Sequence, residues 1–152
     1  MRLICSLNSS RHAFLMSYIY CSQFAEPKRI IFLVDTGCTT TTIAPNDVHR
    51  LEINYDVLEE STPSQTVDRV VIPRILMDVD LFFAGRKGFL NMQRTILKFH
   101  LAQIDVIYPS PREDDEQEHP PPLARSVSML GMDVLKHFRK WHFKNHELLL
   151  DS

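Results

Sequence analysis

The sequence predicts a mostly β protein with one short helix near its C-terminal end, and two observations support this class. Most segments between turn residues are short runs of β-branched, aromatic and aliphatic side chains, several of them alternating with polar residues. A helical spacing of apolar residues occurs late in the chain, over 132–140. With 152 residues, 44% of them hydrophobic, the chain can form one domain with a core, spanning 1–152.

Strand-like segments follow one another through most of the chain. We expect strands at residues 3–7, 14–21, 29–34, 67–72, 75–83, 89–99 and 103–108. Alternation within 75–83 predicts that Asp78 and Asp80 point into solvent. The segment 84–88 is predicted to be a hairpin turn, because Gly85 and Gly88 can both adopt a positive φ.

The C-terminal part has a different pattern. A helix is expected over 132–140, with an apolar face made of Val134, Leu135 and Phe138. Asp133 falls in its first turn, where the helix dipole favours a carboxylate. Short strands are expected on either side of this helix, at 126–130, 141–143 and 148–150.

Residues 109–123 are expected to form an acidic, proline-rich loop insertion. Positions 109–122, PSPREDDEQEHPPP, hold five prolines and five acids, and no apolar side chain other than proline. Such a segment buries too little apolar surface to fold, so it is predicted to be a solvated loop. A regulatory or partner-binding role is the alternative.

Composition argues against several classes of function. The net charge of -2 offers no basic surface for nucleic acid, and no apolar run reaches the roughly 20 residues needed to span a membrane. The apolar segment 14–21 is interrupted by a serine and two tyrosines, which argues against a signal peptide. Three cysteines without a CxxC pair suit a reducing compartment, so a cytoplasmic location is predicted.

One stretch carries a candidate for chemistry, FLVDTGCTTTTIAP at 32–45. A run of apolar residues ends at an acid, Asp35, and a tight turn through Thr36 and Gly37 follows. An ordinary strand ending at a solvated turn would explain these residues equally well, since Asp and Gly are common turn residues. The alternative is that Asp35 is held at the floor of a site.

A second segment, SMLGMDVL at 128–135, lies about 90 residues after the first and leads into the predicted helix. In this order, the two segments resemble the retropepsin-like aspartic proteases, the single-domain, homodimeric family of retroviral type. The resemblance covers residues 29–150, and Cys38 replaces the usual alanine after the Asp-Thr-Gly triplet. It implies a retropepsin-like closed β-barrel, equivalent to half of a two-domain acid protease.

The chemistry explains why the family needs two acids. Hydrolysis of a peptide bond without a metal or a covalent nucleophile requires a base to activate water and an acid to protonate the carbonyl oxygen. Two adjacent carboxylates sharing one proton do both. This chain contains one Asp-Thr-Gly, so a homodimer would have to supply the second Asp35.

The resemblance also implies roles for neighbouring residues. Thr36 and Gly37 would complete the catalytic loop, and Thr41 would be a buried structural hydroxyl. A polypeptide substrate would contact Cys38, Thr39, Thr40, Ser64 and Gln65. A flap is expected near 58–72 with its tip at 61–65, and residues 148–150 would form an interleaved dimer interface.

No cofactor or metal is expected. His137, His142 and His146 lie across a predicted helix end and a strand, so their side chains would not share one face. The main prediction is an aspartic endopeptidase. A catalytically weak or inactive protease-like dimerisation or peptide-binding module is the alternative, because positions 39 and 40 lack acids and the predicted flap tip contains no glycine.

Overall fold

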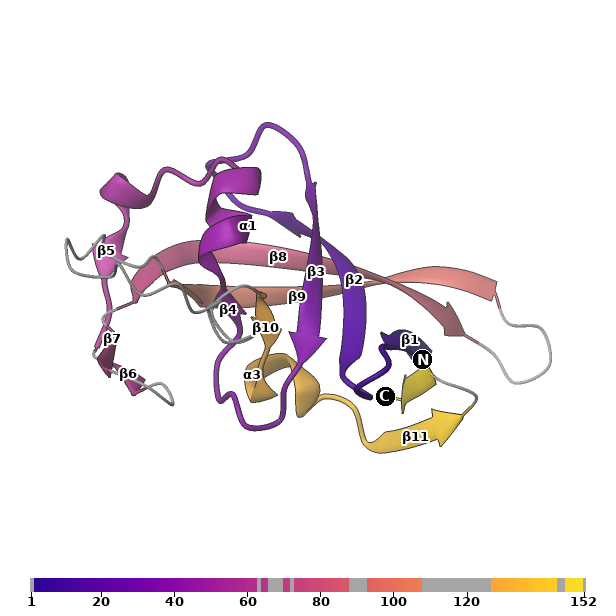
Figure 1. The fold of residues 1–152 in the computed structure, drawn as a ribbon. Coiled ribbons are helices and arrows are strands. Elements are labelled where there is room, and N and C mark those ends of the chain that lie inside the picture. Colours follow the sequence, from indigo (N-terminus) through magenta and orange to yellow (C-terminus); the bar gives the residue numbers. More distant parts are fainter. Residues whose placement is uncertain are drawn as a thin grey trace.

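The computed structural model describes residues 2–62, 64–65, 70–71, 73–87, 93–107, 127–144 and 147–151. It is built mostly of strands with a few short helices, so the predicted fold class is confirmed (Figure 1). The expected insertion at 109–123 lies outside the described residues. None of the described helices is long and apolar enough to cross a membrane.

Three antiparallel strands begin the fold, close to where the sequence predicted them. They are β1 (Arg2–Leu7), β2 (Ala13–Tyr20) and β3 (Lys28–Val34). On β2, Leu15 and Ile19 are buried whereas Met16 and Tyr18 are exposed. This alternation follows from the strand period of two, with one face on the core and the other facing outward.

Two long strands, β8 (Arg74–Lys87) and β9 (Gln93–Val106), form the largest antiparallel pair. Their ladder runs from Arg74 paired with Val106 to Lys87 paired with Gln93, with a break at Asp78. The turn predicted at 84–88 is therefore wrong, since 84–87 belong to β8, and the described parts of the two strands predicted at 89–99 and 103–108 belong to one strand, β9. Cross-strand pairing overrides the local glycine signal here: Gly85 pairs with Thr95 and is buried.

Asp78 interrupts the alternation of β8. Its φ is 50°, in the left-handed region, and it is exposed. Both Leu76 and Val79 are buried, so the alternation slips by one residue across Asp78. Asp78 is solvated as predicted, but Asp80 is not free: it is ion-paired with Lys98 at 2.8 Å.

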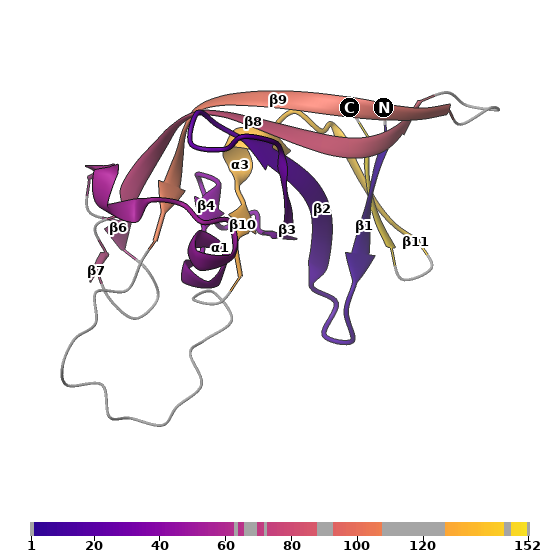
Figure 2. The same ribbon diagram turned by 90° about the horizontal axis from the view of Figure 1, so that it is seen from above.

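The main sheet closes on itself because β8 pairs with β9 on one edge and with β2 on the other. Figure 2 shows β8 and β9 running across the top, with β2, β3 and β10 below them. The core fills the space inside, and its buried side chains include Leu3, Leu15, Ile19, Ile30, Phe32, Ile43, Leu76, Leu81, Phe83, Ile104, Leu130 and Leu135.

Several short elements between β3 and β8 were not predicted. They are β4 (Thr42–Ile43), α1 (Pro45–Arg50), the 3₁₀ turn η1 (Tyr55–Val57) and β5 (Glu59–Glu60). Helix α1 begins with Pro45, whose fixed φ suits the first helical turn, and it buries Val48. Six residues are too short for a readable apolar period.

The segment predicted as a flap contains a small two-stranded sheet, β6 (Ser64–Gln65) and β7 (Val70–Val71). Ser64 pairs with Val71 and Gln65 with Val70. The predicted tip at 61–65 thus includes a strand, and the connection at 66–69 lies outside the described residues. The strand predicted at 67–72 is reduced, in the described part, to β7.

The last elements are β10 (Met129–Leu130), α3 (Met132–Leu135), β11 (Lys140–Lys144) and β12 (Glu147–Asp151). Helix α3 is shorter than the predicted 132–140, because β11 already begins at Lys140. Strand β12 lies between β1 and β11, and Leu148 and Leu150 are buried. Both edges of β12 are paired within the chain, which leaves no free edge there for a second copy, and the role of 148–150 in a dimer interface stays a prediction.

Candidate active site

The Asp35 loop leaves the end of β3 and returns to the sheet at β4. Strand β10 lies between these two strands, parallel to β3 and antiparallel to β4. The backbone N–H of Asp35 donates to the carbonyl of Leu130 at 3.2 Å. The loop is thus held at its start by a strand from the far end of the chain.

Asp35 is presented on this loop with one carboxylate oxygen fixed. Its side chain is half-buried, and its Oδ1 accepts a hydrogen bond from the Gly37 N–H at 2.8 Å. A Cβ at position 37 would lie 3.2 Å from the same oxygen, so a side chain there would crowd the carboxylate. Among the described residues, Oδ2 receives no hydrogen bond, which leaves it open to water or to another carboxylate.

Asp133 anchors the far side of the loop, and the sequence did not predict this. Its two carboxylate oxygens accept hydrogen bonds from Thr41, from the backbone N–H at 2.9 Å and from Oγ1 at 2.7 Å. The Thr41 Oγ1 also accepts from the Gly131 N–H at 3.1 Å, and Thr41 is fully buried. The expected buried hydroxyl of Thr41 is confirmed, and its partner is the carboxylate that was assigned to a helix end.

Backbone hydrogen bonds also connect the Asp35 loop to the segment 131–133. The N–H groups of Met132 and Asp133 donate to the carbonyls of Cys38 and Thr39 at 2.8 and 3.1 Å. A Cβ on Gly131 would lie 2.5 Å from the backbone carbon of Thr40, a distance that excludes any side chain. Glycine is therefore required at 131 for the two chain segments to approach.

Cys38 packs against the loop, and its thiol is expected to be unreactive. Its Sγ donates to the Thr40 carbonyl at 2.8 Å and lies 3.8 Å from Thr42 Oγ1. Burial raises the pKa of the Cys38 thiol above its ordinary value. A thiol whose thiolate is disfavoured is a poor nucleophile, so Cys38 fits the role of a small packing residue.

Three threonines on either side of Cys38 face outward. Thr36, Thr39 and Thr40 are exposed. The Thr40 hydroxyl donates to Asp105 Oδ2 at 3.0 Å, and burial raises the pKa of the Asp105 carboxyl. Asp105 was not singled out from the sequence, because its approach to Thr40 depends on the parallel pairing of β4 with β9.

Ser64 and Gln65 lie in β6, in a separate small sheet. Figure 1 shows this sheet below β5 at the left end of the molecule, and Figure 2 also shows β6 and β7 at the left end. Their contact with a substrate remains a prediction. The described residues also contain no group of three or more His, Cys, Asp and Glu side chains placed to hold a metal ion.

Comparisons with known proteins agree with this geometry. The sequence model of the aspartyl protease family matches residues 24–134. A crystal structure of a retropepsin-like aspartic protease from Rickettsia conorii superposes with a TM-score of 0.58 at 15% identity, over 99% of this chain and 89% of that one. No curated protein sequence matches. With more than half of its length matched, the chain belongs to the aspartyl protease family, and its fold is retropepsin-like.

Proposed function

We propose that the chain is an aspartic endopeptidase that works as a homodimer and activates water between two Asp35 carboxylates. The observation that carries this proposal is the presentation of Asp35, half-buried on a braced loop with Oδ1 fixed and Oδ2 open. When two such carboxylates meet, they cannot both ionise easily, and the pair holds one proton. One carboxylate then acts as base toward water, and the other donates to the carbonyl oxygen of the peptide.

The rigidity of the loop supports catalysis. Hydrogen bonds between 131–133 and 38–41 tie the chain that leaves Asp35 to β10 and α3. Catalytic groups must be held within fractions of an ångström, because misplacement of about 1 Å costs on the order of 100-fold in rate. A loop needed only to turn the chain would not require a buried threonine, an internal carboxylate and a glycine at 131.

The second carboxylate would come from a partner copy related by a twofold axis. Since β12 is paired on both edges, the strand that ends the sheet on this side is β11, whereas β5 ends the strand order at the other side. Phe143 on β11 is 72% exposed, and in Figure 1 both β11 and the loop after β3 lie along the lower side of the molecule. The proposed dimer joins the two Asp35 loops and the β11 edges on this side, with the exposed Thr36 directed toward the partner.

A polypeptide substrate is proposed to lie extended across the two Asp35 loops, its backbone pairing with exposed strand edges. Cys38, Thr39 and Thr40 follow the catalytic triplet and would border it. Ser64 and Gln65 would approach from β6 if that sheet closes over the substrate.

A protease-like module without efficient turnover is the second candidate. The specific observation in its favour is the state of Thr40, whose hydroxyl is already engaged by Asp105. Neither position 39 nor position 40 supplies a carboxylate that could accept hydrogen bonds from the substrate backbone. Such a module would still dimerise and bind peptides.

Cleavage of an unfolded protein such as reduced casein, between about pH 3 and pH 7, separates the two candidates. The wild type should show activity that rises faster than linearly with protein concentration, and Asp35→Asn should lower it by about 10³-fold or more. Asp78→Asn, which changes an exposed acid, is the matched control and should leave activity unchanged.

Mixing the variants gives a sharper test. Excess Asp35→Asn protein should suppress wild-type activity, because mixed dimers contain a single carboxylate. A folded wild-type dimer that binds peptides and cleaves nothing would favour the binding module. Activity that persists in Asp35→Asn would contradict both the mechanism and the assignment of Asp35.

A further inference from the structure

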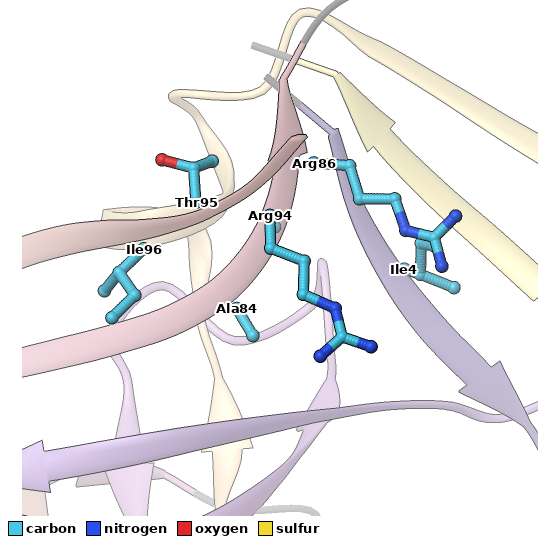
Figure 3. Close-up of a pocket in the computed structure, with 7 residues that line it drawn as sticks. Ile4, Ala84, Arg86, Arg94, Thr95 and Ile96 are labelled. Atoms are coloured by element: carbon cyan, nitrogen blue, oxygen red, sulfur yellow. The ribbon is translucent and has the colours of Figure 1, made fainter. Parts of the chain in front are cut away.

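A pocket with a volume of about 620 Å³ lies where β1 meets the β8–β9 pair. Its walls are mostly apolar and include Ile4, Ala84 and Ile96 (Figure 3). This volume falls within the range of about 300–1,000 Å³ that is typical of small-molecule sites. The pocket forms where β1 diverges from β8, since these two strands pair only at Arg2 and Arg86.

Two arginines stand at this pocket. Arg86 on β8 and Arg94 on β9 are directly opposite in the antiparallel ladder. Figure 3 shows both side chains extending in the same direction, toward β1. Like charges opposite one another on neighbouring strands are destabilising unless something compensates them.

Nothing in the described part of the chain compensates these two charges. Neither Arg86 nor Arg94 has an ion pair or a side-chain hydrogen bond to another described residue, and both are exposed. The nearby cation Arg2 differs, because it donates to both oxygens of Asp151 at 2.8 and 3.0 Å. On β9, Lys98 is likewise paired, with Asp80.

We propose that this pocket, here called the Arg86–Arg94 pocket, binds an amphipathic anion: a carboxylate or phosphate head joined to an apolar chain. The two guanidinium groups would bind the oxygens of the head with charge-assisted hydrogen bonds, for which their planar forks are well suited. The apolar chain would lie along Ile4 and Ile96, and Ile96, 73% exposed, would lose its contact with water. Binding would also relieve the repulsion between the arginines.

Direct binding of simple probes tests this proposal independently of peptide hydrolysis. Decanoate and decyl phosphate distinguish the two possible heads, and decanol and decylamine carry the same chain without a negative charge. We expect isothermal titration at low ionic strength and neutral pH to show binding of at least one anion. Decanol should bind about tenfold more weakly or worse, since it lacks the charge-assisted bonds.

A matched pair of variants assigns the effect to these residues. Arg86→Gln/Arg94→Gln should weaken binding of the anion by about tenfold or more. Arg29→Gln/Arg139→Gln removes the same net charge from exposed positions elsewhere and should leave the affinity unchanged. Ile96→Ser should weaken binding of the long-chain anion, because it removes part of the apolar wall. In the Ile96→Ser background, Arg86→Gln/Arg94→Gln should still weaken binding further, because the head contacts are separate from the apolar wall.

The stability of the unliganded protein provides a second measurement. Arg94→Gln should raise the melting temperature, since it removes one of two opposed charges, and the bound anion should raise the melting temperature of the wild type. Absence of binding by both anions, equal binding of decylamine, or full affinity in Arg86→Gln/Arg94→Gln would each overturn the proposal.

Discussion

At the scale of single residues, Asp133 supports the loop that carries Asp35. Its carboxylate takes both hydrogen bonds that Thr41 can donate, and Thr41 itself is fully buried. A buried N–H and hydroxyl without partners would incur their full desolvation penalty. Asp133 is thus a positioning residue, which acts on Asp35 through the loop.

Replacing Asp133 with alanine should destabilise the protein by about 2–4 kcal/mol, because two buried donors of Thr41 would lose their acceptor. Urea unfolding measures this difference. Asp78→Asn, at an exposed position, should lie within about 0.5 kcal/mol of the wild type. Asp133→Asn keeps one acceptor and should fall between the two. An Asp133→Ala protein as stable as the wild type would show that water replaces the carboxylate.

At the scale of elements, strand β12 joins the two ends of the described chain. It pairs with β1 from Arg2–Asp151 to Ser6–Glu147, and the Arg2–Asp151 ion pair lies at the end of this ladder. The hydrogen bonds from Arg2 hold the pKa of Asp151 below its usual range. This ion pair therefore stabilises the ionised form of Asp151 in the folded state.

The sign of the resulting pH dependence follows from that lowered pKa. The contribution is fully present above the pKa of an unfolded aspartate, near pH 4, and is lost as pH falls through the lower pKa of folded Asp151. Because both side chains are partly exposed, at 34% and 23%, solvent screening limits it to about 0.5–1 kcal/mol.

Asp151→Asn should thus be less stable than the wild type above about pH 4, and the difference should shrink at lower pH. Urea unfolding across this range measures it, and Arg2→Gln should show the same profile. A difference that stays constant with pH would mean that packing around Asp151, and not its charge, is responsible.

At the scale of the whole molecule, the pairing of strands decides which edge remains for a second copy. Strand β11 is at the end of the strand order, whereas β12 is enclosed by β1 and β11. An unpaired edge that carries an exposed aromatic side chain is a ready surface for another chain. The proposed dimer uses this edge.

Phe143→Ser should therefore weaken the dimer by about tenfold in dissociation constant, the loss expected for one aromatic side chain buried at an interface. Sedimentation across a range of concentrations measures it, and the proteolytic activity should shift to higher concentration in parallel. Met77→Ser changes another exposed apolar strand residue, on β8, and should have no effect. Unchanged association of Phe143→Ser would exclude β11 from the interface.

The sequence by itself determined the mostly β class, the positions of β1 to β3 and the two segments that form the Asp35 site. These features are local: alternation along a strand, an acid after an apolar run, and a glycine before a short helix are visible within a few residues. The sequence also predicts a second copy, because a pair of carboxylates needs two acids and the chain contains one Asp-Thr-Gly.

Only the tertiary structure decided the features that depend on pairing between distant segments. The β8–β9 ladder carries the strand through Gly85, where the local signal favoured a turn. The bond between Thr41 and Asp133 joins residues that are 92 positions apart. The enclosure of β12 between β1 and β11 leaves β11 as the terminal strand on that side of the sheet. The physical reason is the same in each case: strand pairing is a long-range interaction, and the residues that it brings together leave no periodic signal in the sequence.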